Sequence, residues 1–165
     1  MGTIDNIYVL NHLVNRKLSG KKGKLVAFFV DLRAAFDSVD REILWRAMRE
    51  RGIREGLVQR CEDMLRETRS RVRVGEKRSE QFWTGRGVKQ GCPLSPGLFN
   101  LLTADLEEEM RKRGWGGVRL KGEKVYSLAY ADDVVLLAEE RDMRAMMARL
   151  ERYVRGKGQE VNVGK

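Results

Sequence analysis

The segment that most constrains the fold is Leu128–Leu137, an apolar stretch that contains two adjacent carboxylates, Asp132 and Asp133. Apolar runs rich in β-branched and aromatic residues are typical of buried strands. Burying two neighbouring anions without partners costs several kcal/mol, so the fold must supply them with water or with a counter-charge. Two arrangements satisfy that requirement: a solvated hairpin tip, or a site in which divalent cations share the two carboxylates.

A third carboxylate ends another apolar run, because Leu25–Val30 stops at Asp31. Antiparallel pairing of these segments would bring Asp31 next to Asp132 and Asp133. Three clustered anions repel one another and raise each other's pKa unless cations neutralise them. Magnesium suits such a site, since it prefers oxygen ligands and leaves room for substrate phosphates. Two magnesium ions held together form the clamp for in-line phosphoryl or nucleotidyl transfer.

The overall charge favours a polyanionic partner. The 165 residues include 33 Lys and Arg against 24 Asp and Glu, which gives a formal net charge of +9. Nucleic acid fits this excess better than a membrane surface does. The length is that of one domain with a substantial core.

The remaining composition excludes several classes of protein. No apolar segment approaches the ~20 residues of a membrane span, and the first residues lack the features of a secretory signal. Cys61 and Cys92 lie in different contexts and form no CxxC pair, which indicates reduced thiols in an intracellular protein. A hydrolase built on histidine would have to use His12, the only histidine, and no motif supports that.

Periodicity and turn residues predict an alternation of helices and short strands. The expected helices are a first one from Thr3 or Asp5 to a loop at 20–23, then 40–51, 54–66, 95–113 and 141–155. The expected strands are 25–30, 118–120, 125–129, 134–138 and a truncated one at 159–165, with a hairpin of 70–74 and 79–84. Asp40 and Ser95 are the expected helix N-caps. The expected inward residues are Ile4, Ile7, Tyr8, Val14 and Leu18 in the first helix; Leu57, Val58, Cys61, Met64 and Leu65 in the third; and Met143, Met146, Met147, Leu150 and Val154 in the last.

Three segments resemble the motifs of one enzyme family. Tyr130–Asp133 resembles the Tyr-x-Asp-Asp box of reverse transcriptases, and Phe29–Asp37 resembles their first palm motif. Gly87–Asn100 is similar to the loop and helix that lie between these two motifs in the family. Its residues are most similar to those of LINE-type, non-LTR retrotransposons. A single four-residue box arises by chance, whereas three in the right order and spacing are specific. The similarity covers nearly the whole chain.

The resemblance implies an α+β polymerase palm, an antiparallel sheet backed by helices, with part of the fingers and no thumb. Residues 1–23 would end the fingers and residues 24–165 would form the palm of a single reverse transcriptase fragment. The implied activity is RNA-directed DNA polymerisation, in which a primer 3′-hydroxyl attacks the α-phosphate of a dNTP. A chain without a thumb loses phosphate contacts to the primer–template duplex, so we expect it to be weakly active or inactive alone.

The resemblance also implies roles for single residues. Asp31 and Asp132 would be the principal ligands of two Mg²⁺, which Mn²⁺ could replace, with Asp133 and the Leu32 backbone in support. The implied dNTP-binding residues are Leu32, Arg33, Ala34, Ala35, Phe36 and Gln90, the implied template and primer contacts are Gln90, Gly91, Pro93 and Tyr130, and Lys165 is a possible general acid. The ring of Phe36 would exclude a 2′-hydroxyl, although ordinary core packing also explains an aromatic residue there. Asp37, Asp40 and Asp105 are expected to be structural, as turn, cap and helix-surface carboxylates.

Two other interpretations stay open on the sequence alone. The chain could be a non-catalytic module that binds nucleic acid or protein through a basic surface containing Arg71 and Arg73. It could also be a relative of group II intron maturases or cellular reverse transcriptases, which share the chemistry. The expected partners of the enzyme are an RNA template, a DNA primer and a dNTP, with no membrane. Apolar surface left by absent fingers and thumb could drive self-association.

Overall fold

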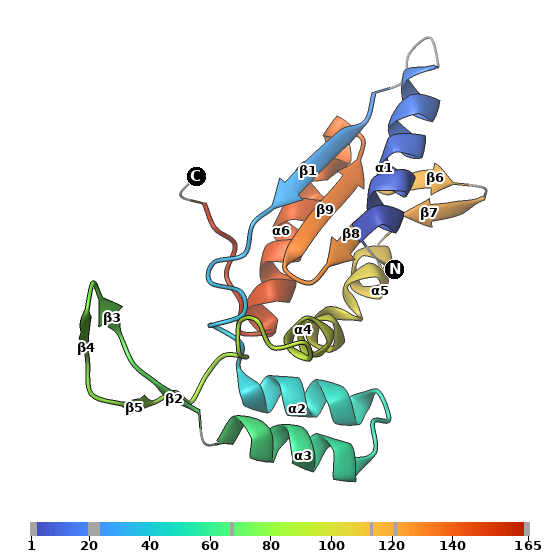
Figure 1. Ribbon diagram of the computed structural model, residues 1–165. Helices are drawn as coiled ribbons and strands as arrows, with labels where there is room; N and C mark the ends of the chain where they lie inside the picture. The colour runs from blue at the N-terminus through green and yellow to red at the C-terminus, as the bar shows by residue number, and fades with distance from the viewer. Residues whose placement is uncertain (1–2, 20–23, 67, 113, 121, 164–165) are drawn as a thin grey trace.

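The computed structural model of the chain describes residues 3–19, 24–66, 68–112, 114–120 and 122–163, and it confirms an α+β fold (Figure 1). The predicted loop at 20–23 and Lys165 lie outside the described residues. The helices are α1 (Thr3–Leu18), α2 (Arg41–Glu50), α3 (Glu55–Arg66), α4 (Ser95–Thr103), α5 (Leu106–Arg111) and α6 (Glu140–Gly156). The strands are β1 (Val26–Val30), β2 (Arg69–Ser70), β3 (Arg73–Val74), β4 (Lys77–Arg78), β5 (Phe82–Trp83), β6 (Val118–Leu120), β7 (Glu123–Val125), β8 (Ser127–Tyr130) and β9 (Asp133–Ala138).

The central sheet has three antiparallel strands in the order β1-β9-β8. Val30, the last residue of β1, lies opposite Val134, and Tyr130 lies opposite Asp133. The chain therefore reverses at Ala131 and Asp132, and β9 runs between strands that are far apart in the sequence. This topology confirms the predicted antiparallel pairing of the two apolar runs.

Helices cover both faces of this sheet, as Figure 1 shows for α6 and α1. On one face Val30, Val134 and Leu136 belong to the main core, which continues into α6, α2 and α4. On the other face Leu128 and Leu137 pack with Leu13 of α1 in a smaller core. Alternate residues along each strand thus enter two separate apolar layers, as the two-residue period of a strand requires.

The predicted inward face of α1 is wrong for three of its five residues, and a fourth, Val14, is half-buried. Ile4, Ile7 and Tyr8 are 82%, 63% and 71% exposed, whereas Leu13 is fully buried and packs with Val9 and Leu10. The helix carries two apolar stripes, and periodicity alone does not say which one meets the sheet. The side chain of Leu18 lies outside the described residues.

Two other helices bury a narrower stripe than predicted. In α3, Val58, Cys61 and Leu65 are buried, but Leu57 and Met64 are exposed. In α6 four of the five predicted positions are buried and Met147 is exposed; the buried ones are Met143, Met146, Leu150 and Val154. Each buried set follows the spacing of three and four residues that keeps side chains on one side of a helix.

The predicted N-cap of α2 is confirmed, and that of α4 is wrong. The Asp40 carboxylate accepts hydrogen bonds from the backbone N–H groups of Glu42 and Ile43 at 3.0 and 3.2 Å. Ser95 is instead the first residue of α4, after Leu94. Its hydroxyl donates to the Lys89 carbonyl at 2.6 Å, so it fixes the preceding loop and leaves the helix end uncapped.

The single helix predicted over 95–113 is also wrong, because α4 ends at Thr103 and α5 begins at Leu106. Asp105, expected to be a surface carboxylate, lies at this break. Its carboxylate accepts from the Tyr153 hydroxyl at 2.7 Å and binds Lys157 and Arg51 at 2.9 and 3.0 Å. Such tertiary partners override the local helical preference of the sequence.

The strand predicted at 125–129 is divided between β7 and β8. The cause is Glu107 of α5, whose carboxylate accepts from the backbone N–H groups of Tyr126 and Ser127 at 3.1 and 3.0 Å. Of the strand predicted at 159–165, residues 164–165 lie outside the described residues, and the described part forms one antiparallel bridge, between Val161 and Leu32.

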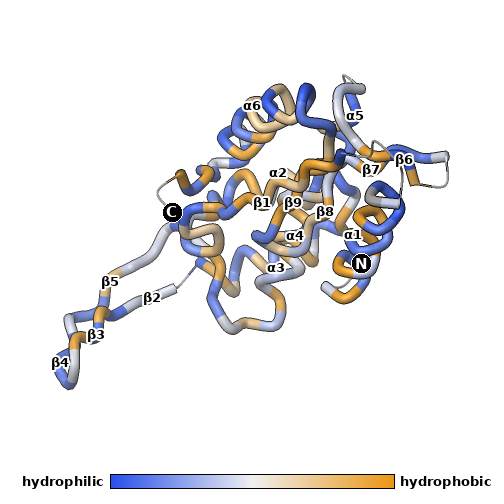
Figure 2. Tube along the Cα trace, turned by 90° about the horizontal axis from the view of Figure 1, so that it is seen from above, coloured by the Kyte–Doolittle hydropathy of each residue, from blue (hydrophilic) through white to orange (hydrophobic). Residues whose placement is uncertain are grey.

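The predicted hairpin forms as a long, narrow ribbon with two short ladders. β2 pairs with β5 at its base and β3 pairs with β4 at its tip, around a turn at Gly75 and Glu76. Between them the ladder is interrupted, and the Ser79 hydroxyl accepts from the Val72 N–H. The ribbon extends away from the rest of the molecule (Figures 1 and 2).

Candidate active site

Three carboxylates gather at one end of the central sheet. Asp31 directly follows β1, Asp132 lies in the turn between β8 and β9, and Asp133 begins β9. Since Val30 lies opposite Val134, continuing the register by one residue places Asp31 across from Asp133. Asp31 and Asp133 are exposed and Asp132 is half-buried. Segments separated by a hundred residues therefore bring these anions to the same end of the central sheet.

The turn that carries Asp132 is conformationally unusual. Ala131 has a φ of +51°, in the left-handed region that costs an alanine about 1 kcal/mol. Its backbone N–H donates to the Asn100 side-chain oxygen of α4 at 2.9 Å. The sequence reasoning assigned no role to Asn100, although a lone amide in the mostly apolar stretch Ser95–Thr103 was a usable signal.

The C-terminal segment supports Asp31 from the other side. The Asn162 amide donates to an Asp31 carboxylate oxygen at 2.8 Å, and the Asn162 N–H donates to the Asp31 carbonyl at 2.8 Å. Arg33 N–H donates to the Glu160 carbonyl, also at 2.8 Å. These bonds fix the backbone on both sides of Leu32. Sequence reasoning missed Asn162, because nothing local connects it to a residue 131 positions away.

No three His, Cys, Asp or Glu side chains among the described residues converge closely enough to hold a metal ion as they stand. The oxygen donors of Asp31, Asp132 and Asp133 nevertheless have the chemistry that magnesium prefers. Asp31 already accepts from Asn162, so a bound cation would share or replace that hydrogen bond.

The predicted dNTP segment forms a tight loop after Asp31. Leu32 and Ala35 are buried at 4% exposure each, and Ala34 has a φ of +46°. The ring of Phe36 stacks on the buried ring of Phe99, with centroids 5.4 Å apart. Phe36 is thus partly buried and packs against the main core, which is the core-packing role that the sequence also allowed.

Backbone hydrogen bonds connect this loop to the second predicted motif. Val88 N–H donates to the Phe36 carbonyl and Gly87 N–H to the Val39 carbonyl, both at 2.9 Å. Gly87 has a φ of +85°, and a Cβ there would lie 2.8 Å from the Asp37 carbonyl oxygen. Only glycine permits so close an approach.

The side chains of the two motifs also meet, since Gln90 donates to the Asp37 carboxylate at 2.9 Å. Gly91 and Pro93 follow on the exposed part of the same loop. Tyr130 is 37% exposed at the end of β8, beside the aspartate turn. Lys165 lies outside the described residues.

Arg41 holds the loop of the second motif in place, and the sequence reasoning missed it. Its guanidinium donates to the carbonyls of Gly87, Thr84 and Arg86 at 2.9, 2.9 and 3.1 Å. It also donates to the Leu65 carbonyl and the Thr68 hydroxyl at 2.7 and 3.0 Å. All five N–H groups of the guanidinium thus donate hydrogen bonds, and none of the acceptors is a carboxylate. Burial lowers the pKa of Arg41.

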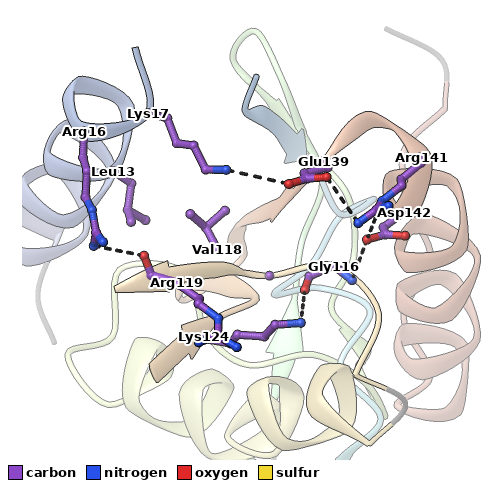
Figure 3. A pocket seen from close by; sticks show the side chains of 11 residues that line it. Leu13, Arg16, Lys17, Gly116, Val118, Arg119, Lys124, Glu139, Arg141 and Asp142 are labelled. Atoms are coloured by element: carbon purple, nitrogen blue, oxygen red, sulfur yellow. Dashed lines mark hydrogen bonds and ion pairs between the residues drawn. The ribbon is translucent and has the colours of Figure 1, made fainter. Parts of the chain in front are cut away.

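A separate basic pocket of about 400 Å³ lies between α1, the β6–β7 hairpin and the start of α6 (Figure 3). Its cations are largely paired within the pocket. Lys17 and Arg141 each lie within 4 Å of the Glu139 carboxylate, at 3.8 and 3.4 Å, and Lys124 donates to the Gly116 carbonyl at 3.2 Å. It borders the end of β9 opposite the aspartates, so it is no part of the carboxylate site.

Comparison with known proteins identifies the family. The model of the reverse transcriptase (RNA-dependent DNA polymerase) family matches residues 2–165. A Pol polyprotein of the type-1 retrotransposable element R2 from Popillia japonica is 35% identical over 164 residues, and that of Nasonia vitripennis is 29% identical over 161 residues. These matches cover 98% and 97% of the chain but only 27% and 15% of the two polyproteins. The chain thus spans about a quarter or less of these relatives.

Solved structures show the same fold. Telomerase from Candida tropicalis, in complex with a fragment of telomeric RNA, superimposes with a TM-score of 0.69 at 16% identity. The superposition covers 99% of this chain and 29% of that one. In the described ranges, no helix has the length and apolarity to cross a membrane. From the family match and the R2 relatives together, the chain belongs to the reverse transcriptase family, as a reverse transcriptase region of the non-LTR retrotransposon type.

Proposed function

We propose that this chain provides the catalytic palm of an RNA-directed DNA polymerase that adds dNTPs to a DNA primer on an RNA template. The observation that supports the proposal is the strand register: β1 ends with Val30 opposite Val134, so Asp31 and Asp133 each lie one residue further on, next to the turn at Asp132. Family membership supports the reaction class. Residues 24–165 would form the palm, and residues 1–23 would belong to the fingers.

The metals we assign are two Mg²⁺, for which Mn²⁺ could substitute. Reverse transcriptases use divalent metals, and the donors available at this sheet edge are all hard oxygens. Asp31 and Asp132 would be the main ligands, with Asp133 and the Leu32 carbonyl in support. Two bound ions would activate the attacking hydroxyl and stabilise the leaving pyrophosphate.

The other residues would position the substrates around these carboxylates. The loop from Leu32 to Phe36 would lie along the triphosphate and sugar, with the ring of Phe36 held in place by Phe99. Gln90 and Gly91 would face the templating base pair, where a glycine lets the backbone approach closely. Pro93 and Tyr130 would contact the template and primer, and Lys165 would protonate the leaving group.

Metal binding offers a direct test. We expect Mn²⁺ to raise the melting temperature of the protein and to enhance water-proton relaxation in a saturable way. The double variant Asp31→Asn with Asp132→Asn should lose both effects, because it removes two of the three anions. The matched double variant Asp63→Asn with Glu55→Gln, which removes two exposed carboxylates of α3, should keep them. Unchanged Mn²⁺ binding by the Asp31→Asn and Asp132→Asn double variant would refute the assigned site.

Activity is tested in the longer protein from which such a region comes, and in this chain. Primer extension on an RNA template should need both Asp31 and Asp132. The chain by itself should extend the primer weakly or not at all, since it offers few phosphate contacts to the duplex. Robust extension by the purified chain at physiological salt would contradict that expectation.

We infer an intracellular location, because Cys61 and Cys92 are both free thiols.

We also infer weak self-association through the exposed stripe of α1 formed by Ile4, Ile7 and Tyr8. Sedimentation velocity checks this inference. The triple variant with serine at these positions should sediment as a monomer at concentrations where the unmodified chain forms larger species.

A further inference from the structure

We propose that the hairpin arm, defined as residues 68–84, binds the phosphodiester backbone of a single-stranded nucleic acid. This inference rests on the proposed polymerase function, whose template is such a strand. The arm lies outside all three motifs that carry the resemblance, so its role is argued from its own charge, exposure and pairing.

The arm is an exposed ribbon joined to the body only at its base. Every residue from 71 to 80 is exposed, and the ribbon points away from the sheet and helices (Figure 2). Its base is closed by the Thr84 N–H, which donates to the Thr68 carbonyl at 3.0 Å, and by Arg41. A hairpin that buries so little of its own surface is marginal in water and gains order from a partner.

The charge of the arm is unbalanced within the described structure. It contains five cations and two glutamates; the cations are Arg69, Arg71, Arg73, Lys77 and Arg78. None of the five forms an ion pair with a described acidic residue. Some cations of the helices are paired, since Arg49 binds Glu55 and Glu62 at 2.7 Å. Isolated helix cations such as Arg46 and Arg60 are exposed without a described ion pair, so the arm differs in having five such cations close together in one hairpin.

The strand register concentrates this charge. Arg73 lies directly opposite Arg78, and Val74 lies opposite Lys77. Like charges directly opposite each other destabilise a β-ladder, unless an anion lies between or beside them. A chain of phosphates spaced along a flexible backbone supplies such anions repeatedly.

Aromatic side chains at the base favour a single strand over other polyanions. Trp83 and Phe82 are 59% and 46% exposed. The Arg69 guanidinium lies 4.3 Å from the Trp83 ring centroid, an arrangement that adds a cation to a stacking surface. Unpaired bases stack on such surfaces, whereas an acidic polypeptide lacks the flat rings to do so.

The arm is well placed to guide a strand toward the carboxylate site. Arg41 connects its base, through Thr68 and Thr84, to the carbonyls of Arg86 and Gly87. Gln90 and its partner Asp37 follow only a few residues later. A strand held along the arm would therefore approach the loop that we assign to the templating base.

The test is the salt dependence of binding to a fluorescein-labelled uridine oligonucleotide, measured by anisotropy. The variant with Arg71, Arg73, Lys77 and Arg78 all changed to Gln should bind at least about tenfold more weakly at physiological salt. The slope of log K against log salt should decrease in magnitude by about 0.7 for each phosphate that the variant no longer neutralises.

The matched control removes the same charge elsewhere, by changing Arg46, Arg54, Arg60 and Arg144 to Gln. These four are exposed and form no ion pair with a described residue. We expect this change to weaken binding by less than about threefold. Equal effects of the two quadruple variants would overturn the proposal. Binding would then depend on the net charge of the whole protein and not on the position of the cations in the arm.

Three further measurements separate binding by the arm from the alternatives. Trp83→Leu should weaken binding about fivefold or more without changing the salt slope, because it removes stacking and no charge. Poly-glutamate should compete poorly with the oligonucleotide, and efficient competition would contradict assignment to a nucleic acid. In the absence of divalent metal, the Asp31→Asn and Asp132→Asn double variant should bind the oligonucleotide at least as tightly as the unmodified chain, because it removes two anions and no cation of the arm. Oligonucleotide binding therefore tests the arm separately from the metal site, which is tested by Mn²⁺ binding.

Discussion

Gln90 donates a hydrogen bond of 2.9 Å from its Nε2 to Oδ2 of Asp37, a residue 53 positions earlier in the chain. This contact joins the loop after Asp31 to the loop before α4, beside the backbone bonds of Gly87 and Val88. The two loops therefore behave as one unit, and a change in either one should alter the other.

Gln90→Glu should destabilise the protein by less than about 1 kcal/mol at neutral pH, because it places two exposed carboxylates together. The neighbouring anion raises the pKa of the new Glu in the folded state, so the penalty appears as pH rises above ~4.3 and is absent at pH 3. Urea denaturation at both pH values measures it. Gln81→Glu, an equal change on the exposed arm, should have no comparable effect.

Arg41→Lys should destabilise the protein by about 2–4 kcal/mol, since an ammonium group cannot reproduce five donors in a planar fork. Arg46→Lys on the same helix is the control, because Arg46 is exposed, and it should change stability by less than about 0.5 kcal/mol. Chemical denaturation gives both values. Equal stability of the two variants would mean that the Arg41 bonds contribute nothing.

Gly87→Ala and Gly91→Ala separate backbone strain from steric collision. Both glycines have a positive φ, +85° and +80°. A Cβ at Gly91 meets nothing within 4 Å, so that variant should lose about 1 kcal/mol. A Cβ at Gly87 collides with the Asp37 backbone, and that variant should lose about 2–4 kcal/mol. Equal losses would exclude a role for the close approach.

The sequence predicted the fold class, the antiparallel pairing and the end of the sheet that carries the carboxylates. These predictions succeeded because apolar runs and apolar–polar alternation indicate where strands lie. It did not predict which stripe of α1 meets the sheet, nor the break at Asp105. Both depend on partners distant in the chain, such as Leu137 for Leu13 and Lys157 for Asp105. The roles of Arg41, Asn100 and Asn162 were not predicted for the same reason, because each of these side chains stabilises the backbone of another segment.

Ala131→Gly should stabilise the protein by about 0.5 kcal/mol, because the strain that glycine relieves at a φ of +51° is partly offset by the backbone entropy that glycine loses on folding. Ala129→Gly, two residues earlier in β8, should instead destabilise it by about 0.5–1 kcal/mol through lost backbone entropy. Thermal denaturation of the two variants should give shifts of opposite sign. Destabilisation of both would mean that the Asn100 contact, and not the left-handed backbone, determines the turn.

The cluster around Asp105 should make stability depend on pH. Burial opposes ionisation of its carboxyl, but hydrogen bonds from Lys157 and Tyr153 outweigh it and hold the pKa of Asp105 below its ordinary value. A lowered folded-state pKa contributes stability that is present above pH ~3.9 and lost as pH falls through the folded-state value.

Asp105→Asn should therefore destabilise the protein by about 1–3 kcal/mol at pH 7, a value limited by the 41% exposure of the carboxylate. The difference from the unmodified chain should shrink as pH falls below ~4, because both side chains are then neutral. Urea denaturation across this range measures it. Asp63→Asn, whose carboxylate is 58% exposed in its pair with Arg66, should cost less than about 0.5 kcal/mol at either pH. A difference for Asp105→Asn that stays constant with pH would show that the cluster acts through packing and not through charge.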